Sequence, residues 1–467
     1  MSDGRATTFV EPAIADRRPA RLPARAPTLF ELLAQIDLNA RMPDIFTARV
    51  GTTVGGKYLH WDEVRRKSPP AGLTREEWWL GIKLARSNGM RAIPLRGVTG
   101  EEFRYLLTDE CLEMLHWIDQ EGGGQILVSE GVTTNADRGR YIVNSLIEEA
   151  ITSSLIEGAV ATRRVAKEML RTGRRPRDKS ERMIVNNYRA MTEISRFARQ
   201  PLTPELVNEL HRTLTEGTLD DPDGAGRPQR PGDDRVKVFA PDGTVVHVPP
   251  PADELPERMQ ALCDFANGRS SDGFVHPVIR AILLHLWLAY DHPYEDGNGR
   301  TARALFYWSM LSAGYWVFEY VSISRIIHAG PAKYARAFLY TETDELDATY
   351  FVLHQQGVLR QAIDELLSHL RTKMKEARET TALLRASTLN HRQVALISHA
   401  LKHPDAEYTA VSHSRSHRVT EQSARNDLQD LAERGMLTRR LVGKRYVFDP
   451  VRNLADMLEQ RDARTDL

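Results

Sequence analysis

The chain has 467 residues, which is too long for one hydrophobic core, so we expect two to four domains. Its 63 basic residues balance 63 acidic residues, which excludes a protein that coats nucleic acid along its whole length but allows a local basic patch. Cys111 and Cys263 form no disulfide or metal pattern, and no apolar segment reaches the roughly 20 residues that span a bilayer. The sequence predicts a cytoplasmic protein without a membrane segment.

Helical spacing of apolar residues dominates the chain and predicts a mainly α fold. Residues 1–28 are rich in Pro, Arg and Ala, and we expect them to form a disordered tail. Thr28 and Glu31 then have the spacing of a capping box, which begins the N-terminal helical extension expected over residues 29–140. The helical spacing is most regular between residues 140 and 170.

Residues 232–250 change to a spacing of two, with valines on both sides of Pro241-Asp242-Gly243. A Pro-Asp-Gly turn between such segments predicts a short β-hairpin. Pro277 suits the first turn of the next helix, which we expect to run to Tyr290, and another helix is expected from Thr301 to Gly314. Residues 346–386 are expected to form a helical connector.

The end of the chain, residues 387–450, has a different pattern of three short helices followed by a hairpin with a basic tip. This order is that of a winged helix-turn-helix domain, and residues 451–467 would be a C-terminal tail. Candidate contacts to DNA phosphates and base edges are Arg418, Gln422, Arg425, Asn426, Lys444 and Arg445. A module that binds protein or dimerises is the alternative. His413 and His417 have zinc-ligand spacing, but no third ligand is evident, which favours an exposed basic turn.

The segment His292-Pro-Tyr-Glu-Asp-Gly-Asn-Gly-Arg300 carries the chemistry of a phosphate site. Gly297 and Gly299 flank Asn298, so the backbone can turn sharply and approach a ligand. The segment opens a helix, and helix N-termini bind anions. Arg300 and Arg303 lie three residues apart on the first turn, where both can fork onto phosphate oxygens.

Two more side chains complete this site. Asp296 is a hard oxygen ligand suited to Mg²⁺, and His292 titrates near neutral pH and can act as a general base. Gly297 to Ala302 also matches the dinucleotide fingerprint G-x-G-x-x-A, but that fingerprint needs a preceding strand, and a helix is expected here. A turn without function is a further alternative, which the register of His292, Arg300 and Arg303 disfavours.

These residues resemble the signature of the Fic family, H-P-F-x-D/E-G-N-G-R-x-x-R, with Tyr294 in place of the usual Phe. The resemblance covers roughly residues 60 to 370. It implies a Fic-type helical core over residues 141–345, which includes a small β-hairpin flap. It also implies an enzyme that transfers AMP from ATP to a Ser, Thr or Tyr hydroxyl of a protein.

The resemblance also implies a role for each matching residue. His292 would take the proton of the target hydroxyl, and Asp296 would hold Mg²⁺ between the α- and β-phosphates. Gly297, Asn298 and Gly299 would cradle the phosphates, while Arg300 would bind the β-phosphate and Arg303 the γ-phosphate. The hairpin residues that would align a target segment by strand addition are Val236, Lys237, Val238 and Phe239.

The segment Ser153-Ser-Leu-Ile-Glu157-Gly158 resembles the inhibitory motif of the same family, S/T-x-x-x-E-G/N. The resemblance implies that Glu157 pairs with Arg303, removes a γ-phosphate ligand and repels the phosphate. An ordinary surface glutamate is the alternative by pattern alone. Removal of AMP by water that Glu157 activates also stays open, as does a DNA-binding regulator with a nucleotide-sensing core. The target protein is unknown, self-modification is expected, and DNA contact and a homodimer are left open.

Overall fold

The computed structural model describes residues 22–123, 135–240, 242–269, 273–386, 389–417, 419–443, 445–454 and 457. For residues 123, 135–141, 373–386 and 402 it describes the backbone alone. The chain divides into two units between Leu366 and Leu367, and each unit is described by itself. The prediction of disorder for residues 1–21 lies outside the described residues.

The N-terminal part of the first unit is a small helical cluster. Its helices are α1 (Leu29–Gln35), α2 (Leu38–Thr47), α3 (Trp61–Val64) and α4 (Arg75–Ser87). Trp79 and the other apolar side chains of these helices form one buried core. The predicted capping box is confirmed, since the side chain and backbone of Thr28 and Glu31 exchange hydrogen bonds. Residues 22–28, expected in the disordered tail, instead run along the protein, and the Ala26 amide donates to the Thr343 carbonyl at 2.8 Å.

An antiparallel hairpin, β1 (Met90–Arg96) with β2 (Glu102–Leu106), lies within the extension that we expected to be helical. Ile93 and Leu95 are buried on one strand and Phe103 and Tyr105 on the other, so the alternation of a half-buried strand is present in the sequence. The prediction of an all-helical extension is therefore wrong at this hairpin. Helix α5 (Asp109–Ile118) follows it.

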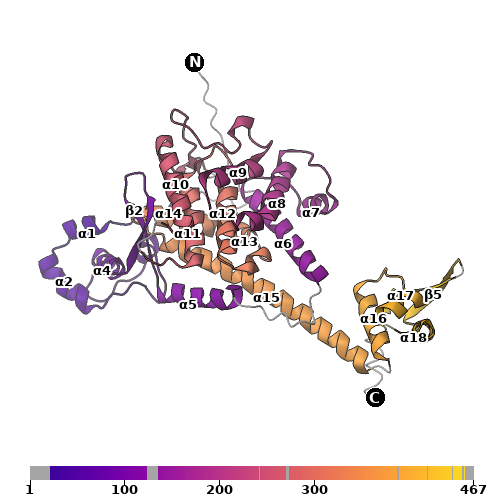
Figure 1. Ribbon diagram of the computed structural model, residues 1–467. Coiled ribbons are helices and arrows are strands. Elements are labelled where there is room, and N and C mark those ends of the chain that lie inside the picture. The colour runs from indigo at the N-terminus through magenta and orange to yellow at the C-terminus, as the bar shows by residue number, and fades with distance from the viewer. Residues whose placement is uncertain are drawn as a thin grey trace. The chain divides into compact units, whose positions relative to one another are not determined.

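The rest of the first unit is a bundle of helices around α11 (Figure 1). Its elements are α6 (Asn135–Ile156), α7 (Arg163–Thr172), α8 (Lys179–Phe197), α9 (Pro204–Thr215), α10 (Leu255–Ala266), α11 (Pro277–Asp291), α12 (Asn298–Ser312), α13 (Ile323–Ala329), α14 (Pro331–Thr343) and the start of α15 (Thr349–Ala386). Pro277 opens α11 as predicted, and nearly every side chain of α11 is buried, because this helix is apolar on all sides. The helix pair α11 and α12 packs closely and brackets the signature segment.

Helix α6 is attached to the bundle through the buried carboxylate of Glu149. That carboxylate accepts hydrogen bonds from the Tyr307 hydroxyl of α12 at 2.8 Å and from the Ser322 hydroxyl at 2.8 Å. The backbone amide and the hydroxyl of Ser324 on α13 also donate to it. A buried carboxylate needs such donors, because desolvation without them is costly. Glu149 therefore fixes α6 against α12 and α13.

The predicted hairpin after α9 is confirmed as β3 (Val238–Phe239) paired antiparallel with β4 (Val245–His247). Arg235 ties the base of this hairpin to the bundle: its guanidinium donates to the carbonyls of Pro250 and Asp291, each at 2.7 Å. The hairpin is thus held next to the point where α11 ends.

The second unit contains the end of α15 and then α16 (His391–Lys402), α17 (Ala410–His417), α18 (Glu421–Glu433), β5 (Leu437–Val442) and β6 (Arg445–Pro450). Leu396, Leu428 and Phe448 belong to its single apolar core, and β5 pairs antiparallel with β6. Three helices followed by a hairpin match the predicted order of elements, while the assignment to the winged-helix class stays a prediction. Among the residues that the structure describes, no helix is long and apolar enough to cross a bilayer.

Candidate functional site

The signature segment forms a tight loop between α11 and α12. His292 ends α11 in the left-handed region, with φ of 45°, and Gly297 precedes α12 with φ of 85°. Asn298 closes the loop, since its side chain accepts from the Tyr294 amide at 2.9 Å and donates to the Tyr294 carbonyl at 2.7 Å. The resemblance placed the Asn298 side chain on the phosphates. In the structure that side chain bonds to the Tyr294 backbone and fixes the shape of the loop, while its phosphate contact stays a prediction.

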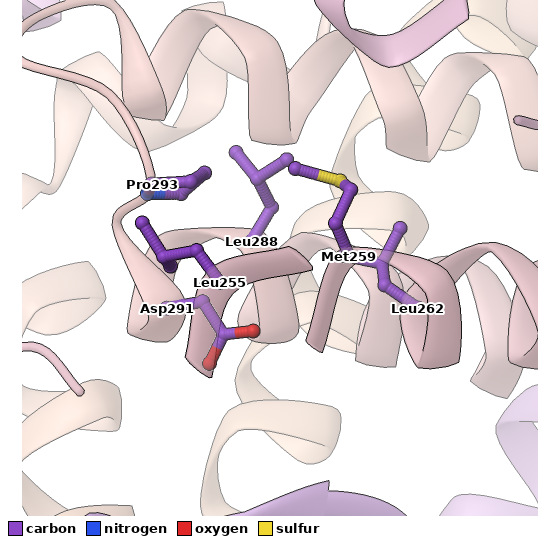
Figure 2. Close-up of a pocket in the computed structure, with 6 residues that line it drawn as sticks. All are labelled: Leu255, Met259, Leu262, Leu288, Asp291 and Pro293. Atoms are coloured by element: carbon purple, nitrogen blue, oxygen red, sulfur yellow. The ribbon is translucent and has the colours of Figure 1, made fainter. Parts of the chain in front are cut away.

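The loop is anchored beneath by apolar packing. Figure 2 shows Pro293 facing Leu255 and Met259 of α10 and Leu288 of α11. The cavity left among them is about 10 Å³, which is at most the size of one water molecule. This contact therefore supports the loop and is not a ligand site.

Tyr294, the departure from the family signature, is fully buried and has a partner for its hydroxyl. The hydroxyl donates to Asn208 Oδ1 of α9 at 2.7 Å, and the ring stacks on His211 with 3.6 Å between ring centroids. A buried tyrosine hydroxyl needs such a bond. The extra oxygen is thus accommodated, and the ring keeps its anchoring position.

His292 is held as a neutral imidazole. Burial and the neighbouring His247 lower the pKa of His292 to about 3, so the ring carries no charge at neutral pH. Its Nδ1 lies 3.4 Å from the Ala289 carbonyl, so this nitrogen carries the proton and Nε2 keeps its lone pair. That is the state that a general base requires.

Arg300 is the first of the two buried signature arginines. Its Nη1 donates to the Leu214 carbonyl at the end of α9 at 2.9 Å, and its Nη2 lies 3.5 Å from Asp296 Oδ2. Among the described residues, Arg300 Nε and Nη2 have no hydrogen-bond partner, although the side chain is fully buried. Buried donors are normally satisfied. Two unsatisfied guanidinium donors at the N-terminus of α12 therefore indicate an anion-binding position.

Arg303, one turn further along α12, is bound by residues at the end of α6 and just after it. It donates to the Ser153 hydroxyl at 2.9 Å, to the Ser153 carbonyl at 3.0 Å and to Glu157 Oε1 at 2.9 Å. Burial alone would lower the pKa of Arg303, and the charge of Glu157 raises it instead. The ion pair implied by the resemblance is thus present, and it occupies the guanidinium to which the resemblance assigns a phosphate.

Glycine is required at two positions beside this ion pair. A Cβ on Gly299 would collide with the Glu157 carboxylate, so the carboxylate lies directly over the first turn of α12. A Cβ on Gly297 would lie 2.6 Å from a methyl group of Thr215, and its positive φ also disfavours a side chain. Gly158, with φ of 85°, ends the turn that carries Glu157. Ser153, Glu157 and Gly158, the residues predicted to be inhibitory, therefore all contribute to this contact.

His211 of α9 is a site residue that the sequence analysis missed. Its Nε2 donates to the Asp296 carbonyl at 2.8 Å, and its Nδ1 accepts from the Gly226 amide at 2.9 Å. Burial lowers the pKa of His211 to about 4. The ring is therefore neutral at physiological pH and has the one donor and one acceptor that these two bonds need. A single histidine in an amphipathic helix gives no local signal, because its partners lie far away in the sequence.

Asp296 is the one acidic side chain of the loop with a carboxylate next to Arg300. Its Oδ1 accepts from the Gly297 amide at 2.6 Å. The described part of the chain has no group of three or more His, Cys, Asp or Glu placed so that it could hold a metal ion. A lone carboxylate nevertheless fits Mg²⁺, which takes most of its ligands from water and substrate phosphates. Asp296 is thus compatible with the metal role that the resemblance implies.

An open groove of about 720 Å³ lies between the loop and the β3–β4 hairpin. It is lined by the hairpin residues Val236, Lys237 and Phe239, by Glu295 and Asp296 of the signature loop, and by residues 219–235 between them. Lys237 and Phe239 are exposed, while Val236 and Val238 are half-buried. The predicted hairpin residues therefore border an accessible groove that reaches the loop.

His247 of β4 connects the hairpin to α11 and α14. Its Nε2 donates to the Tyr290 carbonyl at 2.7 Å, and its Nδ1 lies 2.9 Å from the Glu342 carboxylate. Burial opposes charging of this ring, but the hydrogen bond and charge of Glu342 outweigh burial and raise the pKa of His247 above 6.5. The charged pair therefore stabilises the folded state fully below pH 6.5 and is lost as the pH rises through the raised pKa.

This pair gives a pH-dependent expectation. The stability difference between wild type and a Glu342→Gln variant should be largest below pH 6.5 and should shrink at higher pH. Chemical denaturation across this pH range measures the difference. A gap that stays constant with pH would show that His247 is not charged in the folded protein.

The candidate DNA-contacting residues lie in the second unit. Gln422, Arg425 and Asn426 are exposed on α18, and Arg445 is exposed at the start of β6. The Arg418 and Lys444 predictions lie outside the described residues. His413 is buried and lies 3.2 Å from Asp427, in an ion-pair position rather than a metal site.

Residues 201–310, which include the loop and α9 to α12, match the sequence model of the Fic/DOC family. The chain is 33% identical over 117 residues to a protein adenylyltransferase Fic of Nematostella vectensis, a match that covers 25% of this chain and 24% of that protein. It is 44% identical over 69 residues to a protein adenylyltransferase Fic of Drosophila willistoni, covering 15% and 14%. The chain thus spans about a quarter or less of the length of these relatives.

The fold gives a second comparison. The crystal structure of a Fic family protein from Desulfovibrio desulfuricans G20 superposes with a TM-score of 0.51 at 19% identity, covering 74% of this chain and 97% of that one. This likeness concerns the arrangement of helices and extends beyond residues 201–310. The sequence of residues 201–310 thus resembles the Fic/DOC family, and the fold of the chain resembles that of a Fic family protein.

Proposed function

We propose that the chain is a protein adenylyltransferase, which moves AMP from ATP to a Ser, Thr or Tyr hydroxyl of a protein. The observation that carries the proposal is one loop that holds a neutral His292, a buried Arg300 with unsatisfied donors, and the residues Glu295 and Asp296 that line an open groove. The match to proteins named protein adenylyltransferase supports it. The target protein remains to be identified, and the chain itself is the first candidate.

In this reaction the acceptor oxygen forms a bond to the α-phosphorus of ATP. The bond from that phosphorus to the oxygen that bridges to the β-phosphate breaks, and pyrophosphate leaves. The proton of the acceptor hydroxyl goes to Nε2 of His292, which is free to accept it because Nδ1 faces the Ala289 carbonyl. The protein contributes positioning and charge stabilisation rather than a covalent intermediate.

The phosphates would bind at the N-terminus of α12. Backbone amides there can supply donors, as can the Nε and Nη2 of Arg300, which make no hydrogen bond although Nη2 lies 3.5 Å from Asp296 Oδ2. Asp296 would hold Mg²⁺, which neutralises phosphate charge when bound. Arg303 would take the γ-phosphate once Glu157 leaves it.

The groove beside the β3–β4 hairpin is the proposed site for the target segment. The hairpin has only two short strands, so an extended segment can add to its exposed edge through backbone hydrogen bonds. Arg235 and His247 hold the hairpin against the end of α11 and so keep the target segment near His292.

Glu157 is proposed as an intramolecular inhibitor of this transfer. Its carboxylate pairs with Arg303 and lies over Gly299, so it occupies both the arginine and the space next to the phosphate site. A γ-phosphate placed there would meet a like charge in a buried setting. ATP would then bind in a pose that does not suit transfer.

Intact-mass measurement after incubation with ATP and Mg²⁺ tests the proposed function. A gain of one AMP, lost on His292→Ala, is expected for the adenylyltransferase. If the wild type instead strips AMP from a labelled Glu157→Gly protein, the reaction runs in the removing direction. If neither occurs and the chain only shifts DNA on a gel, a DNA-binding regulator with a nucleotide-sensing core is the better description, and exposed Arg425 and Arg445 would carry it.

His211→Ala should raise the Mg²⁺ concentration that the reaction needs, without abolishing the reaction. The variant loses the bond to the Asp296 carbonyl and the stack under Tyr294, so the Asp296 carboxylate is no longer held in place. Loss of such a supporting contact costs about 10- to 100-fold in metal affinity or activity. The rate of adduct formation against Mg²⁺ concentration measures it. His211→Gln, whose amide can still donate to Asp296, should recover part of the loss; equal defects in both variants would contradict this role.

A further inference from the structure

One face of α7 and the loop after it concentrate positive charge. Residues 163–179 hold eight basic and two acidic residues, a net charge of +6 in a chain whose net charge is zero. We call these eight the basic surface: Arg163, Arg164, Lys167, Arg171, Arg174, Arg175, Arg177 and Lys179. The opposite face of α7 buries Ala166 and Met169 against α6 and α8, which leaves Arg163, Arg164 and Arg171 exposed.

Part of the basic surface has no countercharge. Arg164, Arg175 and Arg177 are exposed and form no ion pair with any described residue. Arg174 is paired with Glu181 and Lys179 with Asp220. Guanidinium groups without a countercharge attract an anionic partner.

The pattern of these cations favours the backbone of a duplex nucleic acid. Arg163, Lys167 and Arg171 are spaced by four residues and so rise about 6 Å from one to the next along α7. A duplex backbone presents closely and evenly spaced phosphates, onto which arginine forks. Residues 163–179 contain no aromatic side chain on which an unpaired base would stack. The surface therefore has donors for phosphates and no ring on which an unpaired base could stack.

The same cations also hold the helix that carries the inhibitory segment. Arg163 and Lys167 both pair with Glu148 of α6, and Arg171 donates to Asn144 Oδ1 at 3.1 Å. Glu148 lies on α6 shortly before Glu157. A phosphate that binds these cations must therefore compete with contacts that keep α6 in position.

We propose that the basic surface binds the phosphate backbone of double-stranded nucleic acid, and that this binding withdraws Arg163 and Lys167 from Glu148 and loosens the contact of Glu157 with Arg303. The binding stands on the charges alone, while the effect on Glu157 rests on the proposed function. The nucleic acid shifts the equilibrium between the state in which Glu148 pairs with Arg163 and Lys167 and the state in which it does not, because it binds the second state better.

Fluorescence anisotropy of a labelled duplex DNA with the full chain tests the binding. The background is the variant Arg425→Ala, Arg439→Ala, Arg445→Ala, which lacks three exposed cations of the second unit. Compared with the wild type, this variant is also the control for the loss of three positive charges. In that background we expect binding whose affinity falls roughly 100-fold from about 50 to 200 mM salt, as four phosphate contacts predict. Adding Arg164→Ala, Arg175→Ala and Arg177→Ala should weaken it at least tenfold. Unchanged affinity overturns the proposal, and so does equally strong competition by polyglutamate, which would identify an acidic protein surface as the partner.

The effect on Glu157 is tested by the rate of AMP incorporation with ATP and Mg²⁺. Duplex DNA should raise the wild-type rate at least about fivefold, the lower range of coupling between sites. It should leave unchanged the rate of Glu157→Gly, which has no inhibitory contact to loosen. It should also leave unchanged the rate of the variant with Arg164→Ala, Arg175→Ala and Arg177→Ala. If Glu157→Gly incorporates no AMP, the proposed function fails while the anisotropy result stands by itself. If Glu157→Gly is labelled but DNA leaves the wild type unchanged, the regulatory part is overturned.

Discussion

Replacing Glu157 by glycine is expected to raise the rate of self-adenylylation roughly 10- to 100-fold. The variant frees the Arg303 guanidinium, which then hydrogen-bonds the γ-phosphate instead of a carboxylate. A hydrogen bond to a charged group contributes about 1.5–3 kcal/mol, which corresponds to this range of rates. Intact-mass measurement over time, at one ATP concentration, gives the rate.

Two further variants separate this effect from a general loosening of the fold. Ser153→Ala removes the hydroxyl bond to Arg303 but keeps the Ser153 carbonyl and Glu157 bonds, so a smaller rise is expected. Glu216→Gly removes an exposed carboxylate from the turn after α9 and should change nothing. A Glu157→Gly protein that is labelled no faster than wild type would contradict the inhibitory role of Glu157.

The second large effect is expected for His292→Ala in the Glu157→Gly background, where the rate should fall by about 10²- to 10⁴-fold, the usual contribution of a general base. The lowered pKa of about 3 keeps His292 neutral, so it needs no prior loss of a proton at physiological pH. We therefore expect that titration of His292 does not change the rate between about pH 5 and 8.

ATP binding distinguishes loss of the base from loss of the site. The His292 ring makes one weak contact, to the Ala289 carbonyl, so its removal should leave ATP affinity unchanged. Arg300→Ala removes two unsatisfied donors and should weaken ATP binding as well as the rate. A His292→Ala protein that retains a tenth or more of the rate would exclude His292 as the base.

The loop could be predicted from the sequence because its function depends on consecutive residues. Glycines, arginines and Asp296 stand within one short stretch, and their spacing alone places them on a turn and the first turn of α12. The Glu157–Arg303 pair was accessible only through the resemblance, since no local pattern connects residues so far apart. The hairpin after α9 could be predicted like the loop, because its Pro-Asp-Gly turn is a local signal.

Two features were missed for different physical reasons. The bonds of His211 depend on how α9 packs against the loop, which the sequence of α9 does not encode. The β1–β2 hairpin did carry a signal, an alternation at Ile93 and Leu95 with Gly97 and Gly100 in the turn, but it was hidden among helical segments. The bonds of His211 depend on tertiary packing, whereas the β1–β2 hairpin is encoded locally by a spacing of two over a short segment.

The dependence of Arg303 on α6 bears on how the protein can be dissected. A fragment that begins at residue 201, where the family match starts, would leave the buried Arg303 guanidinium without Ser153 and Glu157. It would also strip the Trp308 indole of its acceptor, the Phe197 carbonyl. Removing one partner of a buried ion pair costs about 3–5 kcal/mol, a large part of the stability of a typical domain. The smallest portion that folds should therefore begin no later than α6, and shorter fragments should be insoluble or inactive whatever their signature loop contains.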